Sequence, residues 1–227
     1  MNNTKTMNSE EVMRGLIQVW SDFSTRLDTV PILDKLNRGK FRKEDYKTLL
    51  MNHRQQVVEG GRWIARAASS IDDQYFEMRS KFMQHCVTEH SDFKMLEKNY
   101  VSLGGKLEDI QNGQKNIGTE ALNAFMFHRA SQPNPLSLLG AMFIIEGLGQ
   151  NKAGEWGHAI RDQLDLEDSQ VSFLIYHAEH DDDHMEEFDE ALNSGILEIE
   201  NMGEDIIKTA KIVARLYQLQ MEEIDNV

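Results

Sequence analysis

Apolar residues recur at helical spacing along most of the chain, and no segment of any length alternates apolar and polar residues as a strand would. In residues 10–27, for example, Val12, Leu16, Val19 and Phe23 fall on one face of a helix. The same pattern predicts helices over residues 31–39, 45–70, 72–103, 119–131 and 136–148, a short one around Trp156, a long one carrying residues 177–184 and ending near 193–195, and a last one over 198–223.

Helix-breaking residues fall between these segments. Pro31 opens a short helix that Gly39 ends, Gly104 and Gly105 end the segment from residue 72, and two further prolines precede residue 136. Residues 1–9 are polar and are expected to form a flexible tail. The chain is therefore predicted to be all-α, with residues 10–227 forming a single-domain bundle of about seven to eight helices.

Composition and charge narrow the classes of function. The 227 residues include 24 Lys and Arg against 38 Asp and Glu, which gives a net charge of −14. This acidity disfavours binding to nucleic acid or to an anionic membrane. A single cysteine, Cys86, fits a reducing compartment, and the N-terminus lacks the apolar core of a signal peptide. The apolar run from Leu138 is too short to cross a bilayer. We therefore expect a cytoplasmic protein with no membrane and no nucleic-acid partner.

The stretch HAEHDDDH, residues 177–184, is the most informative motif. His177, Asp181 and His184 stand at i, i+4 and i+7, and on an α-helix these positions lie within about 60° of one another. Two imidazoles and a carboxylate on one face of a helix are typical ligands of non-haem iron. The alternative is a solvated acidic helix face, which the neighbouring acidic residues favour. His180 lies beside the three and is the candidate for a catalytic role.

A similar pattern occurs in QHCVTEHSDF, where His85, Glu89 and Asp92 also stand at i, i+4 and i+7. Two helices that face each other with such residues can enclose a pair of metal ions. Glu146 is the third element, because a carboxylate among the apolar residues of GAMFIIEGLG is costly to bury without a partner. A metal, an arginine or a set of backbone donors would each satisfy it. Cys86 is interpreted as a small buried side chain rather than a nucleophile.

These motifs, and the order of elements around them, resemble the haem-oxygenase-like superfamily. The resemblance rests on LDKLNRGKFRKEDYKTLLMNHRQQV, on EHSDFKMLEKNYVSLGG and on HAEHDDDH, and it extends from about residue 20 to residue 195. The superfamily includes haem oxygenases, thiaminase-II-type proteins, pyrroloquinoline-quinone synthases and di-iron oxidases. It implies a haem-oxygenase-like helical bundle, in which homodimers are common. Haem oxygenases bind haem through a His of the N-terminal helix, and no His precedes His53, so no haem is expected.

The di-iron members imply a set of metal ligands. His177, Asp181 and His184 match the ligands of the third core helix, and Glu89 matches the Glu of the second. Asp92 replaces a His that often ligates there, and Glu146 matches a carboxylate near the metals of some relatives. The Glu expected from the first core helix has three candidates, His53, Gln55 and Glu59, and the sequence leaves the choice open.

The resulting hypothesis is a dioxygen-activating oxidoreductase that holds two non-haem iron ions and acts on a small organic substrate. The predicted metal ligands are His177, Asp181, His184, Glu89, His85 and Asp92, and the predicted catalytic residues are Glu146 and His180. One alternative is a metal-free enzyme of the thiaminase-II or quinone-synthase type, acting on a heterocycle. The other is a non-catalytic helical module with a degraded site.

Overall fold

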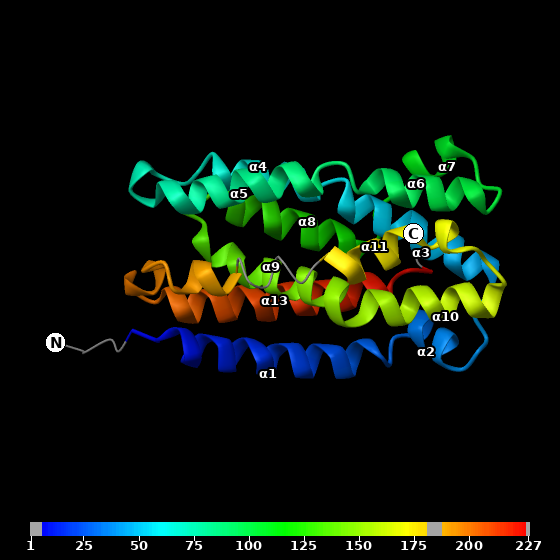
Figure 1. The fold of residues 1–227 in the computed structure, drawn as a ribbon, viewed down its shortest axis with the longest axis horizontal. Helices are drawn as coiled ribbons and strands as arrows, with labels where there is room; N and C mark the ends of the chain where they lie inside the picture. The colour runs from blue at the N-terminus through cyan, green and yellow to red at the C-terminus, as the bar shows by residue number, and fades with distance from the viewer. Residues whose placement is uncertain (1–5, 181–187, 226–227) are drawn as a thin grey trace.

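The computed structural model describes residues 6–180 and 188–225, and within these ranges the secondary structure is helical, with no strand (Figure 1). The predicted all-α class is therefore confirmed. In chain order the α-helices are α1 (Ser9–Leu27), α2 (Pro31–Asn37), α3 (Lys43–Val57), α4 (Gly60–Ala68), α5 (Phe76–Glu89), α6 (Phe93–Ser102), α7 (Leu107–Gln111), α8 (Ile117–Ala130), α9 (Leu139–Leu148), α10 (Gly154–Leu164), α11 (Ser172–His180) and α13 (Met202–Glu222). Between them lie the short 3-10 turns η1 (Asp73–Tyr75), η2 (Leu136–Leu138), η4 (Asp168–Gln170) and η5 (Ile196–Glu198), and the π-helical turn η3 (Gly149–Ala153).

Local sequence signals set several helix ends. Asn8 caps α1 by accepting a hydrogen bond from the Glu11 amide at 2.9 Å, and the Glu11 side chain accepts one from the Asn8 amide in return. Pro31 occupies the first turn of α2, where its missing N–H costs nothing. Gly104, which follows α6, has a φ of +81°, a conformation that glycine adopts without strain.

Two segments that were predicted as single helices are each divided in two. The segment from residue 45 to 70 is interrupted at Val58 and Glu59, between α3 and α4. The segment from residue 72 to 103 is interrupted after Glu89, where tighter i→i+3 hydrogen bonds such as that from the Asp92 amide to the Glu89 carbonyl replace the α-helical ones. The prediction that Asp92 continues the helix of Glu89 is therefore wrong, because Asp92 is the N-cap residue of α6.

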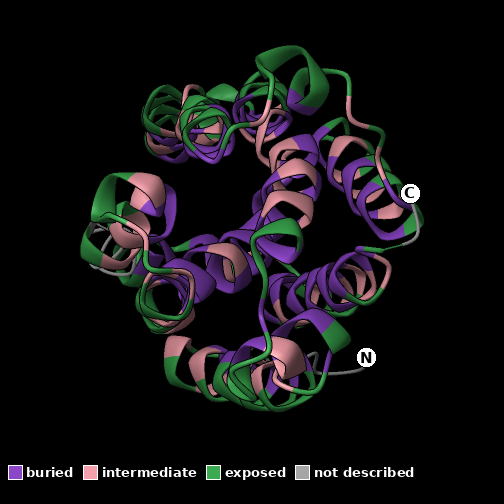
Figure 2. Ribbon diagram, turned by 90° about the vertical axis from the view of Figure 1, so that its right-hand side faces the viewer, coloured by how far each residue is buried: buried purple, intermediate pink, exposed green. Residues whose placement is uncertain are grey.

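The C-terminal helix α13 is the centre of the packing. It contacts α1, α8 and α9, and the three surround it along most of its length (Figure 1). Glycines permit these close contacts, since a methyl group at Gly140 of α9 would overlap the carbonyl oxygen of Ile206, and one at Gly118 of α8 would overlap the backbone at Gln220. Seen along the bundle, buried residues face inward and exposed residues face outward (Figure 2). Within the described ranges, no helix combines the length and apolarity that a membrane span requires.

The remaining helices pack in pairs around this centre. Helix α4 lies against α5, α3 against α6, and α10 against α11. Glycines also set the spacing of two of these pairs. A methyl at Gly61 would come within 2.7 Å of His90 Cβ, and one at Gly157 within 3.1 Å of Leu174 Cβ. The π-helical turn η3 continues α9 into α10 and contacts α11, so the short predicted segment around Trp156 is part of a longer helical path.

Candidate metal centre

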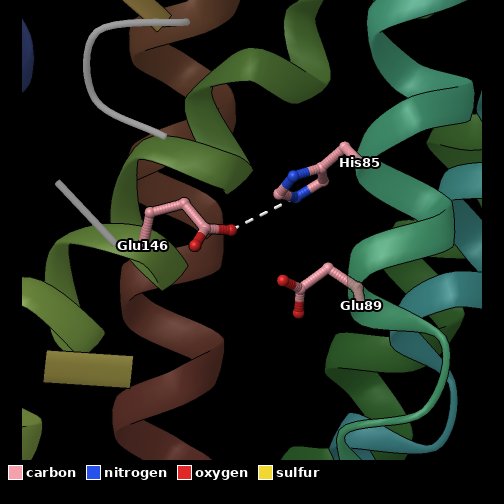
Figure 3. Close-up of side chains that lie close together, drawn as sticks. All are labelled: His85, Glu89 and Glu146. Carbon is pink, nitrogen blue, oxygen red and sulfur yellow. Dashed lines mark ion pairs between the residues drawn. The ribbon is translucent and has the colours of Figure 1, made fainter. Parts of the chain in front are cut away.

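Three of the predicted site residues meet across two helices. His85 and Glu89 lie one turn apart on α5, and Glu146 approaches them from α9 (Figure 3). His85 Nε2 is 3.3 Å from Glu146 Oε1, and each of the three residues offers a ligand atom within 4.8 Å of the other two. The side chains converge on one point from opposite walls, as metal ligands do in helical bundles.

Glu146 is buried, with 7% of its surface exposed, although α9 is otherwise apolar. The contact with His85 explains how this carboxylate is accommodated, because a buried charge requires a charged or hydrogen-bonding partner. Of the partners considered from the sequence, a metal, an arginine or backbone donors, the structure brings an imidazole to it. That imidazole is itself a predicted metal ligand.

A second His–carboxylate pair lies nearby. Asp92, at the start of α6, places Oδ2 3.6 Å from Nε2 of His177 on α11, and both side chains are largely buried. The His177 ring packs against two aromatic rings of its own helix, those of Phe173 and Tyr176, with centroids 4.4 Å and 5.4 Å away. The helix break after Glu89 therefore brings Asp92 to His177 rather than into the group formed by His85 and Glu146.

Glu89 is electrostatically linked to both pairs. The pKa of its carboxyl is raised to about 7, first by burial and then by the negative charges of Glu146 and Asp92, while His85 and His177 act in the opposite direction. Glu89 itself belongs to the group of ligand atoms formed with His85 and Glu146. The arrangement is thus one His–Glu–Glu cluster with a second imidazole–carboxylate pair, His177 and Asp92, close enough to influence its charge.

Four of these residues, His85, Glu89, Glu146 and His177, line a cavity of about 100 Å³. His53 and Gln56 add further polar groups to its wall, and the aromatic rings in the wall come from α3, α4, α10, α11 and α13 and belong to Tyr46, Trp63, Trp156, Phe173 and Tyr217. A smaller cavity of about 40 Å³ shares His85, Met142 and Glu146 with the first. The cavity walls are largely apolar, which is the usual character of a site for a small organic molecule.

The three candidate ligands from the first core helix, His53, Gln55 and Glu59, differ in their partners and in whether they line the cavity. Glu59 follows α3 and forms ion pairs with Arg62 at 2.6 Å and Lys115 at 2.9 Å, and Gln55 donates a hydrogen bond to the carbonyl of Ile110 at 2.7 Å. Neither lines the cavity, whereas His53 does. We therefore expect neither Gln55 nor Glu59 to bind a metal.

His53 is held neutral in this wall. Burial, and to a lesser degree His177, lower its pKa to about 4, and its Nδ1 lies 3.5 Å from the Tyr217 hydroxyl. From the sequence, His53 was only one of three candidate ligands of the first core helix, and Gln56, which lines the cavity one turn further on, was not identified. The i, i+3, i+4 spacing of Tyr46, Leu49, Leu50, His53 and Gln56 was the signal that places both on one face.

The other predicted residues lie outside the group or outside the described ranges. Asp181 and His184 are not among the described residues, and His180 is described only as the last residue of α11. Cys86 does not line the cavity; its thiol donates to the Gly61 carbonyl at 3.1 Å, and burial raises the pKa of that thiol. A raised pKa and a structural hydrogen bond disfavour a thiolate nucleophile.

Solved structures establish the class of fold. A domain of unknown function with a haem-oxygenase-like fold from Shewanella denitrificans OS217 superposes with a TM-score of 0.86 at 19% identity, covering 97% of this chain and 93% of the other. A TenA homologue from Pseudomonas syringae pv. tomato DC3000 gives 0.72 at 14% identity, with 98% and 97% covered. One from P. horikoshii OT3 also gives 0.72 at 14%, with 94% and 97% covered. The chain therefore has the haem-oxygenase-like fold.

The family is defined by sequence. A family model described as "iron-containing redox enzyme" matches residues 50–218, which run from the second half of α3 through α11 and include most of α13. The chain belongs to this family of haem-oxygenase-like proteins. Among curated protein sequences there is no significant match.

Proposed function

We propose that the protein is a non-haem iron oxidoreductase that activates dioxygen at a two-iron centre and acts on a small organic molecule in the adjoining cavity. The observation that carries the proposal is the convergence of His85, Glu89 and Glu146, whose ligand atoms lie within 4.8 Å of one another at the edge of a largely apolar cavity. Membership of a family described as iron-containing redox enzymes supports the choice of metal.

The residues present fit such a centre. Imidazole nitrogens together with carboxylate oxygens are the donors that non-haem iron uses. In the absence of a cation, Glu89 and Glu146 disfavour each other's charge, as the raised pKa of Glu89 reflects. A divalent cation between them would remove this repulsion and hold both carboxylates deprotonated. A bound cation would therefore account for the placement of a second carboxylate, Glu89, beside the His85–Glu146 pair.

His85, Glu89 and Glu146, whose ligand atoms the structure brings together, would hold one ion, and Asp92 and His177 would contribute to holding the other. Asp181 and His184 would complete the second site; this remains a prediction from their spacing with His177 on one helix face. His180 keeps its predicted catalytic role on the same basis.

Ferrous iron, when bound, would supply the electrons that reduce dioxygen. The chain's own residues provide the surroundings for that chemistry. The wall that includes Trp63, Trp156 and Phe173 would hold an apolar substrate beside the carboxylates and limit the contact of that substrate with bulk water. His53 stays neutral at physiological pH and adds no positive charge that would compete with a metal ion.

A metal-free enzyme is the second candidate, because TenA homologues share the fold. The thiaminase-II type depends on a cysteine nucleophile, and the surroundings of Cys86 argue against that role here. A helical module with a degraded site is the third candidate, and it would bind no metal.

Metal stoichiometry tests these candidates. The purified protein is freed of metal, incubated anaerobically with ferrous iron and desalted, and bound iron is counted; we expect about two equivalents, and oxygen uptake when air is admitted. His85→Ala and His177→Ala should each lose at least one equivalent, whereas His158→Ala, an exposed position of α10, should lose none. Less than one equivalent in the wild type, unchanged in His177→Ala, would rule out the proposed centre. Undiminished thermal stability in chelator would then favour a metal-free protein.

A further inference from the structure

The face of α3 that lines the cavity carries two polar side chains, His53 and Gln56, among apolar ones. The two other buried amide side chains of this helix have partners in the protein. Asn52 donates hydrogen bonds to the carbonyls of Thr48 and Ile224, and Gln55 donates one to that of Ile110. These amides stabilise the packing of α3. In the part of the chain that the structure describes, no such hydrogen bond explains why Gln56 is buried on this helix.

The Gln56 side chain is 8% exposed, and its Oε1 is enclosed without a hydrogen-bond partner among the described residues. Leaving a buried acceptor unsatisfied destabilises a fold, and a methionine of similar length would fill the same place without that cost. Two other buried oxygens, those of Thr119 and Gln220, share this condition, but neither residue lines the cavity. Gln56 therefore combines an unused hydrogen-bonding group with a position facing the substrate cavity.

The charge of the cavity limits what this amide can recognise. The described lining residues include the carboxylates of Glu89 and Glu146 and no lysine or arginine, and most of the remaining wall is aromatic or aliphatic. An anionic group away from the metal ligands would lose its hydration without gaining an ion pair. A neutral group can instead exchange hydrogen bonds with a side-chain amide, which offers one acceptor and two donors.

We propose that Gln56 is a specificity-determining residue that hydrogen-bonds a neutral polar group (an amide, alcohol or carbonyl) on a substrate whose remaining body is apolar. The inference rests on the proposed function in taking this cavity as the substrate site. Recognition by Gln56 is nevertheless independent of iron, because Gln56 is not part of the metal centre. A site organised around such a bond discriminates strongly against analogues that lack the bonding group.

Tryptophan fluorescence gives a direct readout, because Trp63 and Trp156 both line the cavity. Three probes with the same aromatic body are titrated into the full-length protein: 3-phenylpropanamide, propylbenzene and 3-phenylpropanoate. We expect the amide to bind about 5- to 10-fold more tightly than propylbenzene, as one buried hydrogen bond provides. In metal-free protein the carboxylate probe should bind more weakly than the amide.

Substitutions assign the preference to Gln56. Gln56→Met should reduce the affinity for the amide to that for propylbenzene and leave propylbenzene binding unchanged, and its melting temperature confirms that it is folded. Gln18→Met, at an exposed position of α1 outside this cavity, should retain the full preference.

Three results would overturn the proposal. They are an amide preference that persists in Gln56→Met, a carboxylate probe that binds metal-free protein more tightly than the amide, and an amide that fails to bind at millimolar concentration. The titrations are run on protein as purified and again in EDTA, and the amide preference should be equal in both. Loss of iron binding would thus refute the proposed function without changing this result, and loss of the preference would refute the role of Gln56 alone.

Discussion

The raised pKa of Glu89 predicts an inverse dependence of stability on pH in the metal-free protein. The carboxyl titrates near pH 7 when folded, against a usual value of 4.5, because of burial and the neighbouring Glu146. Between these pH values the folded chain holds a proton that the unfolded chain releases. The contribution of Glu89 to the free energy of unfolding therefore falls as pH rises and is lost fully above pH 7. A pKa shift of this size corresponds to about 3 kcal/mol of unfolding free energy.

Glu89→Gln isolates this contribution, because the amide keeps the shape of the protonated acid and cannot ionise. In EDTA at pH 8 the variant should exceed the wild type in unfolding free energy by up to about 3 kcal/mol, or roughly 6–12 °C in Tm for a chain of this size. At pH 4.5 the two should be nearly equal. The measurement is urea and thermal denaturation of both proteins at several pH values between 4.5 and 8.

Ferrous iron should reverse the order of stability of the wild type and Glu89→Gln at pH 8. A bound cation requires the deprotonated carboxylate, so iron should stabilise the wild type at pH 8 and stabilise Glu89→Gln much less. If the two metal-free proteins show parallel stability curves across this pH range, the electrostatic reasoning about Glu89 is wrong. If iron stabilises both equally, Glu89 is not a ligand.

Two further predictions concern packing and His53. Gly140→Ala should lower the unfolding free energy by about 3 kcal/mol, because its methyl would overlap the Ile206 carbonyl, whereas Gly60→Ala, with open space around the added methyl, should change thermal denaturation little; equal effects would contradict the packing argument. The pKa of His53, lowered to about 4 by burial, means that the unfolded chain takes up a proton first as pH falls below 6.5. The wild type should therefore lose up to about 3 kcal/mol relative to His53→Gln between pH 7 and pH 4 in urea denaturation, and a constant difference would refute this.

The sequence pattern predicted the fold class and many helix limits because those depend on local periodicity. The start of α1 was predicted within one residue of Ser9, and the glycine after α6 ends that helix as expected. The divisions after Val57 and after Glu89 were missed. At the first, α4 must approach α5 closely enough that Gly61 contacts His90, and such a tertiary contact leaves no periodic signal.

The candidate site was predictable where chemistry and local spacing coincide. Glu146 was identified because an acid among apolar residues needs a partner, and His85 with Glu89 because i and i+4 share a helix face. Asp92 was assigned to the same face by assuming an unbroken helix, and the structure pairs it with His177 instead. Gln56 was not identified: its spacing places it on the cavity face of α3, but the sequence does not show that its amide oxygen is buried there without a partner.

The π-helical turn at Gly149–Ala153 makes the orientation of α10 relative to α9 depend on the number of residues in that turn. A π-turn contains one residue more than an α-helical turn, and that residue rotates the faces of α10 by about 100° relative to those of α9. Glu146 lies before the turn, and Gly154 and Gly157, which admit α11, lie after it. Deleting one residue would leave Glu146 in place and rotate both glycines away from the helix that carries His177. Homologues that keep this centre should therefore vary here by substitution and not in length.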